Sequence, residues 1–242
     1  MTAVPSEPSR ATASHLVTPR PIPVPVLREV VTSLVWAVVV PALAALAFLL
    51  AMAAEVVPSS ATAWVLPLAA LPGALGMWWW LHRQGLGARD VGLTRPRRSL
   101  AHLVWEVPLA IMGSAVIAAL LAPLLGVSAG GSEGALASGG LDLPSRLAML
   151  VTSVLVIPLL EEICFRYFLL GWLRRAMPVG AAVVASAVVF GLVHVAPAIM
   201  CYVIPLGVAL AWVRTWHGTL WASVVLHACN NAVVTLVLLA AL

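Results

Sequence analysis

The stretch Pro158-Leu-Leu-Glu-Glu-Ile-Cys-Phe-Arg166 places two adjacent acids and an arginine inside an otherwise apolar run. Residues 147–157 before it and 167–173 after it are almost entirely apolar, which predicts a membrane-spanning helix. An ionisable side chain in that setting costs roughly 2.5–3.5 kcal/mol on insertion scales. Three such groups within a few residues therefore indicate a functional site that faces the protein interior rather than lipid.

The composition supports a membrane protein. Of the 242 residues, 62% are hydrophobic and 9% are charged, whereas about 25% of the residues of a soluble domain are charged. The formal charge of +4 comes from arginine, since the chain has no lysine. The arginines are not gathered on one polar surface, so nucleic acid is not an expected partner, and the lipid bilayer is.

Seven apolar spans follow one another along the chain, and a helix of ~20 residues crosses the ~30 Å of hydrocarbon in a bilayer. The expected fold class is therefore all-α: a polytopic membrane helical bundle with about seven transmembrane helices. The fifth and sixth spans are the shortest, and only Ala196 and Pro197 separate them. The predicted spans are 30–54, 62–81, 102–127, 147–171, 178–195, 197–213 and 219–241.

The arginines predict the orientation of these spans. With the N-terminus inside, eleven of the thirteen arginines fall on inner segments, as expected for cytoplasmic loops. We therefore expect a multi-pass protein of the cell membrane with a cytoplasmic N-terminus and an outer C-terminus. Tryptophans near the predicted inner ends fit an interfacial belt: Trp36, Trp78, Trp79, Trp80, Trp105, Trp172, Trp212, Trp216 and Trp221.

Helical spacing assigns different roles to the two acids. Glu162 and Arg166 are four residues apart and can pair on one helix face. Glu161 is rotated by ~100° from Glu162, so it can point into a central cavity. We expect Glu162 and Arg166 to be an orienting pair and Glu161 to be the working carboxylate. Pro158, one turn earlier, is expected to kink the helix.

Two further polar pairs lie in later spans. Phe190 and His194 are four residues apart, as are His227 and Asn231. Counted at 1.5 Å per residue from the predicted inner boundary, Glu161 lies at a depth of roughly 20 Å, His194 at about 24 Å, and His227 and Asn231 at about 14 and 20 Å. All four groups can therefore share one layer near the middle of the membrane.

This set of side chains is suited to hydrolysis. Glu161 can act as general base on a water molecule that His194 shares, while His227 and Asn231 donate hydrogen bonds to an oxyanion. Glu161, His194 and His227 also match a three-ligand catalytic zinc site. The residues leave both mechanisms open, so the expected cofactor is either none or a divalent metal such as zinc.

The three motifs together resemble the CPBP (Abi) family of CAAX-processing and bacteriocin-processing intramembrane proteases, which includes the type II CAAX prenyl endopeptidases. The matching residues are EExxxR (Glu161, Glu162, Arg166), FxxxH (Phe190, His194) and HxxxN (His227, Asn231). The resemblance covers residues 145–240 and implies an all-helical membrane fold and endopeptidase activity. It also implies a site of one glutamate, two histidines and an asparagine.

The chain accordingly divides into three parts. Residues 1–27 are expected to be a disordered, proline-rich cytoplasmic tail, residues 28–145 the N-terminal transmembrane helices, and residues 146–242 the catalytic core. The expected substrate is a membrane-associated peptide or protein, with or without a lipid, because no residue pattern shows a prenyl-binding groove. The Gly/Ser-rich loop 128–145 is expected to be flexible and outside.

Two other classes of function remain open. Intramembrane glutamate and histidine also mark ion pathways, so a proton-coupled transporter is one alternative. A transporter favours an inverted repeat, and none is recognisable in the sequence. The other alternative is a non-catalytic membrane scaffold or immunity protein that binds a partner.

Several weaker signals are assigned structural roles. His102 and Glu106, four residues apart, are expected to form an interfacial polar pair. His15, His82 and His217 are expected to be solvated in the tail or in loops.

The cysteines and one serine motif do not indicate a catalytic site. Cys164, Cys201 and Cys229 all lie in apolar runs, are odd in number and form no CxxC pair, so they are expected to be small core residues. Gly126-Val-Ser-Ala-Gly130 matches the G-x-S-x-G pattern but lacks the strand–turn–helix context of a nucleophile elbow.

Overall fold

The computed structural model describes residues 23–127 and 141–241, and this part of the chain is helical, with no strand. Of the predicted disordered tail 1–27 and flexible loop 128–145, residues 1–22 and 128–140 lie outside the described residues. Within the remainder, the first helix begins at Leu27 and residues 143–145 are helical, so both segments are shorter than predicted. The α-helices are α1 (Leu27–Leu34), α2 (Val40–Ala53), α3 (Val65–Arg83), α4 (Leu103–Leu124), α5 (Leu143–Val151), α6 (Ile157–Glu162), α7 (Leu170–Ala176), α8 (Val179–Leu192), α9 (Pro197–His217) and α10 (Leu220–Ala241).

Seven apolar helical segments match the seven predicted spans. Six of the described segments are long and apolar enough to cross a membrane, and α8 is a shorter apolar helix. The prediction of a polytopic helical bundle is thereby confirmed, and the chain is a multi-pass membrane protein. The six long segments are Leu27–Ala53, Ser59–Arg83, Leu100–Leu124, Leu143–Ala176, Pro197–His217 and Leu220–Ala240.

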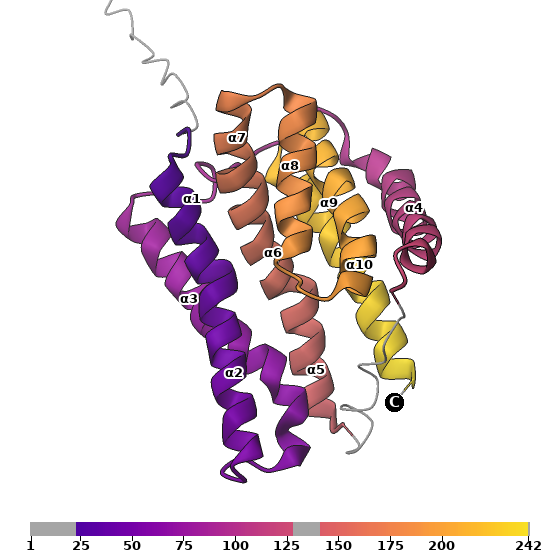
Figure 1. Ribbon diagram of the computed structural model, residues 1–242. Helices are drawn as coiled ribbons and strands as arrows, with labels where there is room; N and C mark the ends of the chain where they lie inside the picture. Colours follow the sequence, from indigo (N-terminus) through magenta and orange to yellow (C-terminus); the bar gives the residue numbers. More distant parts are fainter. Residues whose placement is uncertain (1–22, 128–140, 242) are drawn as a thin grey trace, which may run out of the picture.

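The segment that carries the two acids runs through the middle of the bundle. Figure 1 shows α5, α6 and α7 as one continuous column, with α1 to α3 on one side and α8 to α10 on the other. This column spans 34 residues, or ~51 Å of helix, which exceeds the ~30 Å of the hydrocarbon core. Helix α10 packs against α6 and α9, and α4 packs against α9 at the outer edge.

Two prolines follow wide helical turns. A π-helical turn at Val35–Val39 precedes Pro41 in the first turn of α2, and another at Thr152–Val156 precedes Pro158 in the first turn of α6. Proline has no N–H to donate and its ring crowds the preceding turn, so the helix widens at these points. The distortion expected at Pro158 is therefore located just before it.

Helix α8 ends inside the bundle. It has 14 residues, or ~21 Å of helix, so it stops short of the far side, and Figure 1 shows the α8–α9 connection part of the way down the molecule. Residues 193–196 are not helical, and Val195 has a φ of 61°, which is uncommon for a β-branched residue. Irregular backbone at membrane depth is tolerated where it is buried in protein or lines a water-filled space.

Small residues allow α8 and α9 to approach each other closely. A Cβ atom added to Gly207 of α9 would lie 3.2 Å from backbone and side-chain atoms of Ala187 of α8. Ala187 and Ala211 are fully buried. Because lipid is as apolar as the side chains, helices in membranes associate through such close packing.

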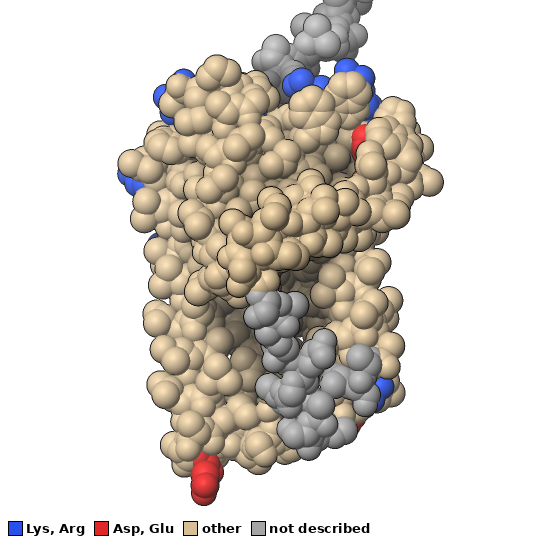
Figure 2. Space-filling model, turned by 45° about the vertical axis from the view of Figure 1, so that its right-hand side comes forward, with Lys and Arg blue, Asp and Glu red and all other residues tan. Residues whose placement is uncertain are grey.

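The arginines gather at one end of the bundle, which we call the basic end. It comprises the start of α1, the segment between α3 and α4, the end of α7 and the end of α9, with Arg28, Arg83, Arg89, Arg95, Arg97, Arg98, Arg174, Arg175 and Arg214. In Figure 2 most of the visible blue atoms lie at the upper part of the molecule. The described arginines thus keep the one-sided pattern expected from the sequence.

The prediction that His217 is solvated is wrong. Helix α9 continues one turn beyond the predicted end of the sixth span, and the His217 side chain is fully buried. The α3–α4 segment packs over this end, because the Arg97 N–H donates to the His217 carbonyl and the Leu220 N–H donates to the Gly92 carbonyl, both at 2.8 Å. Gly218, with a φ of 67°, ends α9 in the left-handed conformation that glycine adopts readily.

We predict that Gly76→Ala destabilises the packing between α3 and the segment that precedes α2. A Cβ atom at Gly76 would overlap the indole ring of Trp36, and overpacking of this kind costs about 1–3 kcal/mol. The melting temperature of the purified protein in detergent measures the effect. Gly113→Ala in α4, where no atom lies within 4 Å of the added Cβ, is the matched control and should not lower it.

Candidate functional site

A buried ion pair lies at the end of α6. The Glu162 side chain is fully buried and Arg166 is 2% exposed, with Arg166 Nε 3.4 Å from Glu162 Oε2. The guanidinium carbon also lies 4.4 Å from the centroid of the Phe190 ring, in cation–π contact. Arg166 lies in a π-helical segment, Ile163–Leu169, and still reaches Glu162 as the helical spacing predicted.

His227 of α10 lies between the two acids. Its Nδ1 is 3.0 Å from Glu162 Oε1, and its Nε2 is 3.6 Å from Glu161 Oε2. The hydrogen bond to the buried carboxylate of Glu162 favours a proton on Nδ1, which fixes the ring orientation and turns Nε2 toward Glu161. Glu162 therefore contacts both Arg166 and His227, a second partner that the spacing along one helix could not reveal.

His194 lies just beyond the C-terminal end of α8. Its Nδ1–H donates to the Phe190 carbonyl oxygen at 2.8 Å, which leaves Nε2 without a proton in the neutral ring. The Phe190 ring is in edge-on contact with His194 at 5.0 Å and with His227 at 5.8 Å between centroids. Phe190 thus sits between the two imidazoles and also covers the guanidinium of Arg166.

Asn231, one turn beyond His227, is held by a polar network. Its Nδ2 donates to the Ser153 carbonyl oxygen at 2.8 Å, and its Oδ1 accepts from Asn230 Nδ2 at 3.1 Å. Asn230 Oδ1 in turn accepts a hydrogen bond from the Tyr202 hydroxyl. Ser153 Oγ lies 2.9 Å from the Thr235 hydroxyl.

The sequence pattern alone did not predict this supporting network. Asn230 is adjacent to Asn231 in an apolar run, which is a visible signal. Ser153, Tyr202 and Thr235 come from other elements or later turns, and single polar residues in apolar spans do not reveal their partners.

Burial divides the predicted site residues into two groups. Glu162, Arg166 and His227 are buried, whereas Glu161, with a side chain 17% exposed, and His194 and Asn231 are half-buried. The half-buried groups are those expected to meet water and substrate. The three motifs thus converge on one region of the bundle, as their estimated depths predicted.

The donor atoms of Glu161, His194 and His227 do not form a compact metal site. Among the described residues, one group of three candidate ligands has all its donor atoms within 4.8 Å of one another, and it is a different group: His102, Glu106 and His217. A three-ligand zinc site needs ligand atoms at about 2.0–2.2 Å from the ion. His227 Nε2 and Glu161 Oε2 are 3.6 Å apart, but the donor atoms of His194 do not complete a group of three within 4.8 Å, so the three motif residues do not form a compact ligand set.

Comparison with known proteins finds a family match in the C-terminal part of the chain. Residues 143–233 match the family model of the type II CAAX prenyl endopeptidase, Rce1-like. No curated protein and no solved structure matches the chain. The match confirms the resemblance carried by the three motifs and supports a CAAX-type intramembrane protease, which is a hydrolase.

We predict strong energetic coupling between Glu162 and Arg166. Arg166→Met leaves a buried carboxylate without its cation and should lower the free energy of unfolding by roughly 3–5 kcal/mol. The double variant Glu162→Gln/Arg166→Met should be more stable than the sum of the two single effects implies. Thermal unfolding of the four proteins in detergent measures the coupling, and additive losses would show that the pair is not an energetic unit.

Proposed function

We propose that this protein is an intramembrane endopeptidase in which Glu161 activates a water molecule for attack on a peptide bond. The observation that carries the proposal is the half-buried Glu161 carboxylate, 3.6 Å from His227 Nε2, beside a fully buried Glu162 that holds the histidine from its other side. One carboxylate orients the site and the other is accessible to substrate. The match of residues 143–233 to a CAAX protease family supports this reaction class.

Each step of the proposed reaction has a residue to perform it. Glu161 removes a proton from the water as its oxygen attacks the scissile carbonyl carbon. Nε2 of His194, whose Nδ1–H is engaged by Phe190, accepts a second hydrogen bond from the same water. The proton on Glu161 then passes to the leaving amine as the C–N bond breaks, which balances the hydrolysis.

His227 and Asn231 are proposed to stabilise the oxyanion. Glu162 holds the His227 ring through Nδ1, so an Nε2–H of this ring would point away from Glu162 as a donor. Asn231 uses one Nδ2 hydrogen for the Ser153 carbonyl and keeps the second for substrate. Donors that are already held in place need no reorganisation when charge develops.

The proposed substrate is a peptide or protein associated with the membrane, with or without a lipid. Peptide hydrolysis at this depth requires substrate to enter from the bilayer or from the basic end. We further propose that the basic end faces the cytoplasm of a cell membrane, with the N-terminus inside and the C-terminus outside. Residues 146–242 then form the catalytic core, and the helices of 28–145 flank it.

We predict that Glu161→Gln strongly slows cleavage and leaves folding intact. Glutamine keeps the size of the half-buried side chain but cannot accept the proton of water, so kcat should fall by about 10²–10⁴-fold. His194→Ala should lower kcat by a factor in the same range. Cleavage of quenched fluorescent peptides, prenylated and unprenylated, by purified protein in detergent measures the rate.

The control for these variants is His82→Ala, an exposed histidine at the end of α3, which should retain full activity and the same melting temperature. If Glu161→Gln and His194→Ala cleave as fast as the unaltered protein, the assignment is wrong. Retained biological activity in a variant that carries both Glu161→Gln and His194→Ala would favour the scaffold, and a proton-driven flux lost in Glu161→Gln would favour the transporter.

We predict that Asn231→Ala lowers kcat by about 10²–10³-fold with little change in KM, because an oxyanion donor acts mainly in the transition state. Thr235→Val is the matched control, since it alters the same α10 face and removes only the hydroxyl near Ser153. It should leave kcat within a few-fold of the unaltered protein. Equal losses in both variants would assign Asn231 a packing role.

A further inference from the structure

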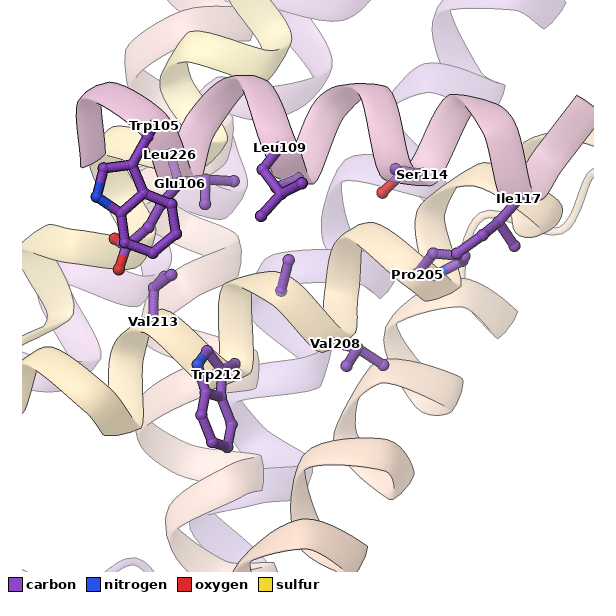
Figure 3. A pocket seen from close by; sticks show the side chains of 13 residues that line it. Trp105, Glu106, Leu109, Ser114, Ile117, Pro205, Val208, Trp212, Val213 and Leu226 are labelled. Carbon is purple, nitrogen blue, oxygen red and sulfur yellow. The ribbon is translucent and has the colours of Figure 1, made fainter. Parts of the chain in front are cut away.

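An apolar pocket lies between α4 and α9, away from the motif residues. Its volume is about 330 Å³, and Figure 3 shows Leu109, Val208 and Trp212 along its length, with Glu106 and Trp105 at one end. Glu106 is 8% exposed, and its carboxylate is the acidic group in a lining that is apolar apart from Ser114 and the indole N–H groups of Trp105 and Trp212. A buried carboxylate in such a place needs a cationic partner.

Two histidines lie beside that carboxylate. His217 Nε2 of α9 is 2.9 Å from Glu106 Oε2, and His102 precedes Glu106 by one helical turn. The rings of His102 and His217 are 6.0 Å apart between centroids. The donor atoms of all three side chains lie within 4.8 Å of one another.

We propose that His102, Glu106 and His217 bind a divalent transition-metal ion of the zinc type at the basic end. Two imidazoles and one carboxylate are a ligand set that zinc uses with an open fourth position. Ligand atoms at about 2.1 Å from a tetrahedral ion lie roughly 3.4 Å apart. One pair of ligand atoms is 2.9 Å apart and all three lie within 4.8 Å of one another, so small side-chain movements would close the site.

The surroundings of His217 support a metal ligand. Its Nδ1 lies 3.3 Å from the Arg98 carbonyl oxygen, the kind of second hydrogen bond that orients metal-binding histidines. With the proton on Nδ1, the neutral ring turns the Nε2 lone pair toward the Glu106 carboxylate, which also only accepts. Two such acceptors 2.9 Å apart can bind one metal ion together.

The proposed metal site is open to solvent, and a bound ion would link two helices. His102 is exposed, so an ion can reach it from the basic end. The guanidinium of Arg98 is stacked 3.7 Å from the Trp216 ring centroid, where its charge is engaged by the ring. A bound ion would join α4 to α9 at the mouth of the pocket, with its open position available to a ligand there.

The test is metal binding to purified full-length protein after treatment with a chelator. We expect one Zn²⁺ per chain by calorimetry, and Co²⁺ in its place should give the visible absorption of a tetrahedral site. Added Zn²⁺ should raise the melting temperature. His102→Ala and Glu106→Gln should each weaken binding at least tenfold, whereas the control His82→Ala should bind as the unaltered protein does.

Two results would overturn the proposal. One is the absence of stoichiometric Zn²⁺ binding to the unaltered protein, which would leave His217 and Glu106 as a buried ion pair between α4 and α9. The other is unchanged affinity in both His102→Ala and Glu106→Gln. Because His102 is exposed, its replacement should preserve folding, which the melting temperature without metal verifies. This test measures metal binding and not peptide cleavage, so its outcome is independent of the proposed protease activity.

Discussion

The buried cluster of Glu162, Arg166 and His227 is the constraint on which the rest of the bundle depends. A buried carboxylate in a membrane must be neutralised, and Arg166 on the same helix and His227 on α10 both reach it. Breaking either contact would leave a charge in a setting of low dielectric. The helices that carry these groups therefore have to pack in one relative position, and that position also brings Glu161 beside the imidazole.

The early end of α8 is the second requirement of the site. If α8 crossed the whole bilayer, residue 194 would lie within a regular helical turn, and its backbone N–H and C=O groups would both be hydrogen-bonded within the helix. The break after Leu192 frees the chain to turn, and His194 is held there by a hydrogen bond to Phe190. Close packing of Gly207 against Ala187 fixes α9 to α8 on the other side of this break.

Much of the fold could be predicted because apolar length and helical period are local properties of the chain. The seven spans, the Glu162–Arg166 pair and the Phe190–His194 contact follow from spacing along single segments. The end of α9 was misplaced because Arg214 and His217 look like loop residues in sequence. In the structure the α3–α4 segment covers this end of α9, and the Arg97 N–H donates a backbone hydrogen bond to the His217 carbonyl.

The sequence by itself determined that this protein is a helical membrane bundle with three polar motifs in its later spans, since unpaired charge cannot be left in lipid. Only the tertiary structure decided which partners those motifs have. His227 contacts Glu162, which is 65 positions away in the sequence, and His217 contacts Glu106, which is 111 positions away. Such contacts depend on how helices far apart in sequence are arranged side by side, and that arrangement follows from the packing of all of them together.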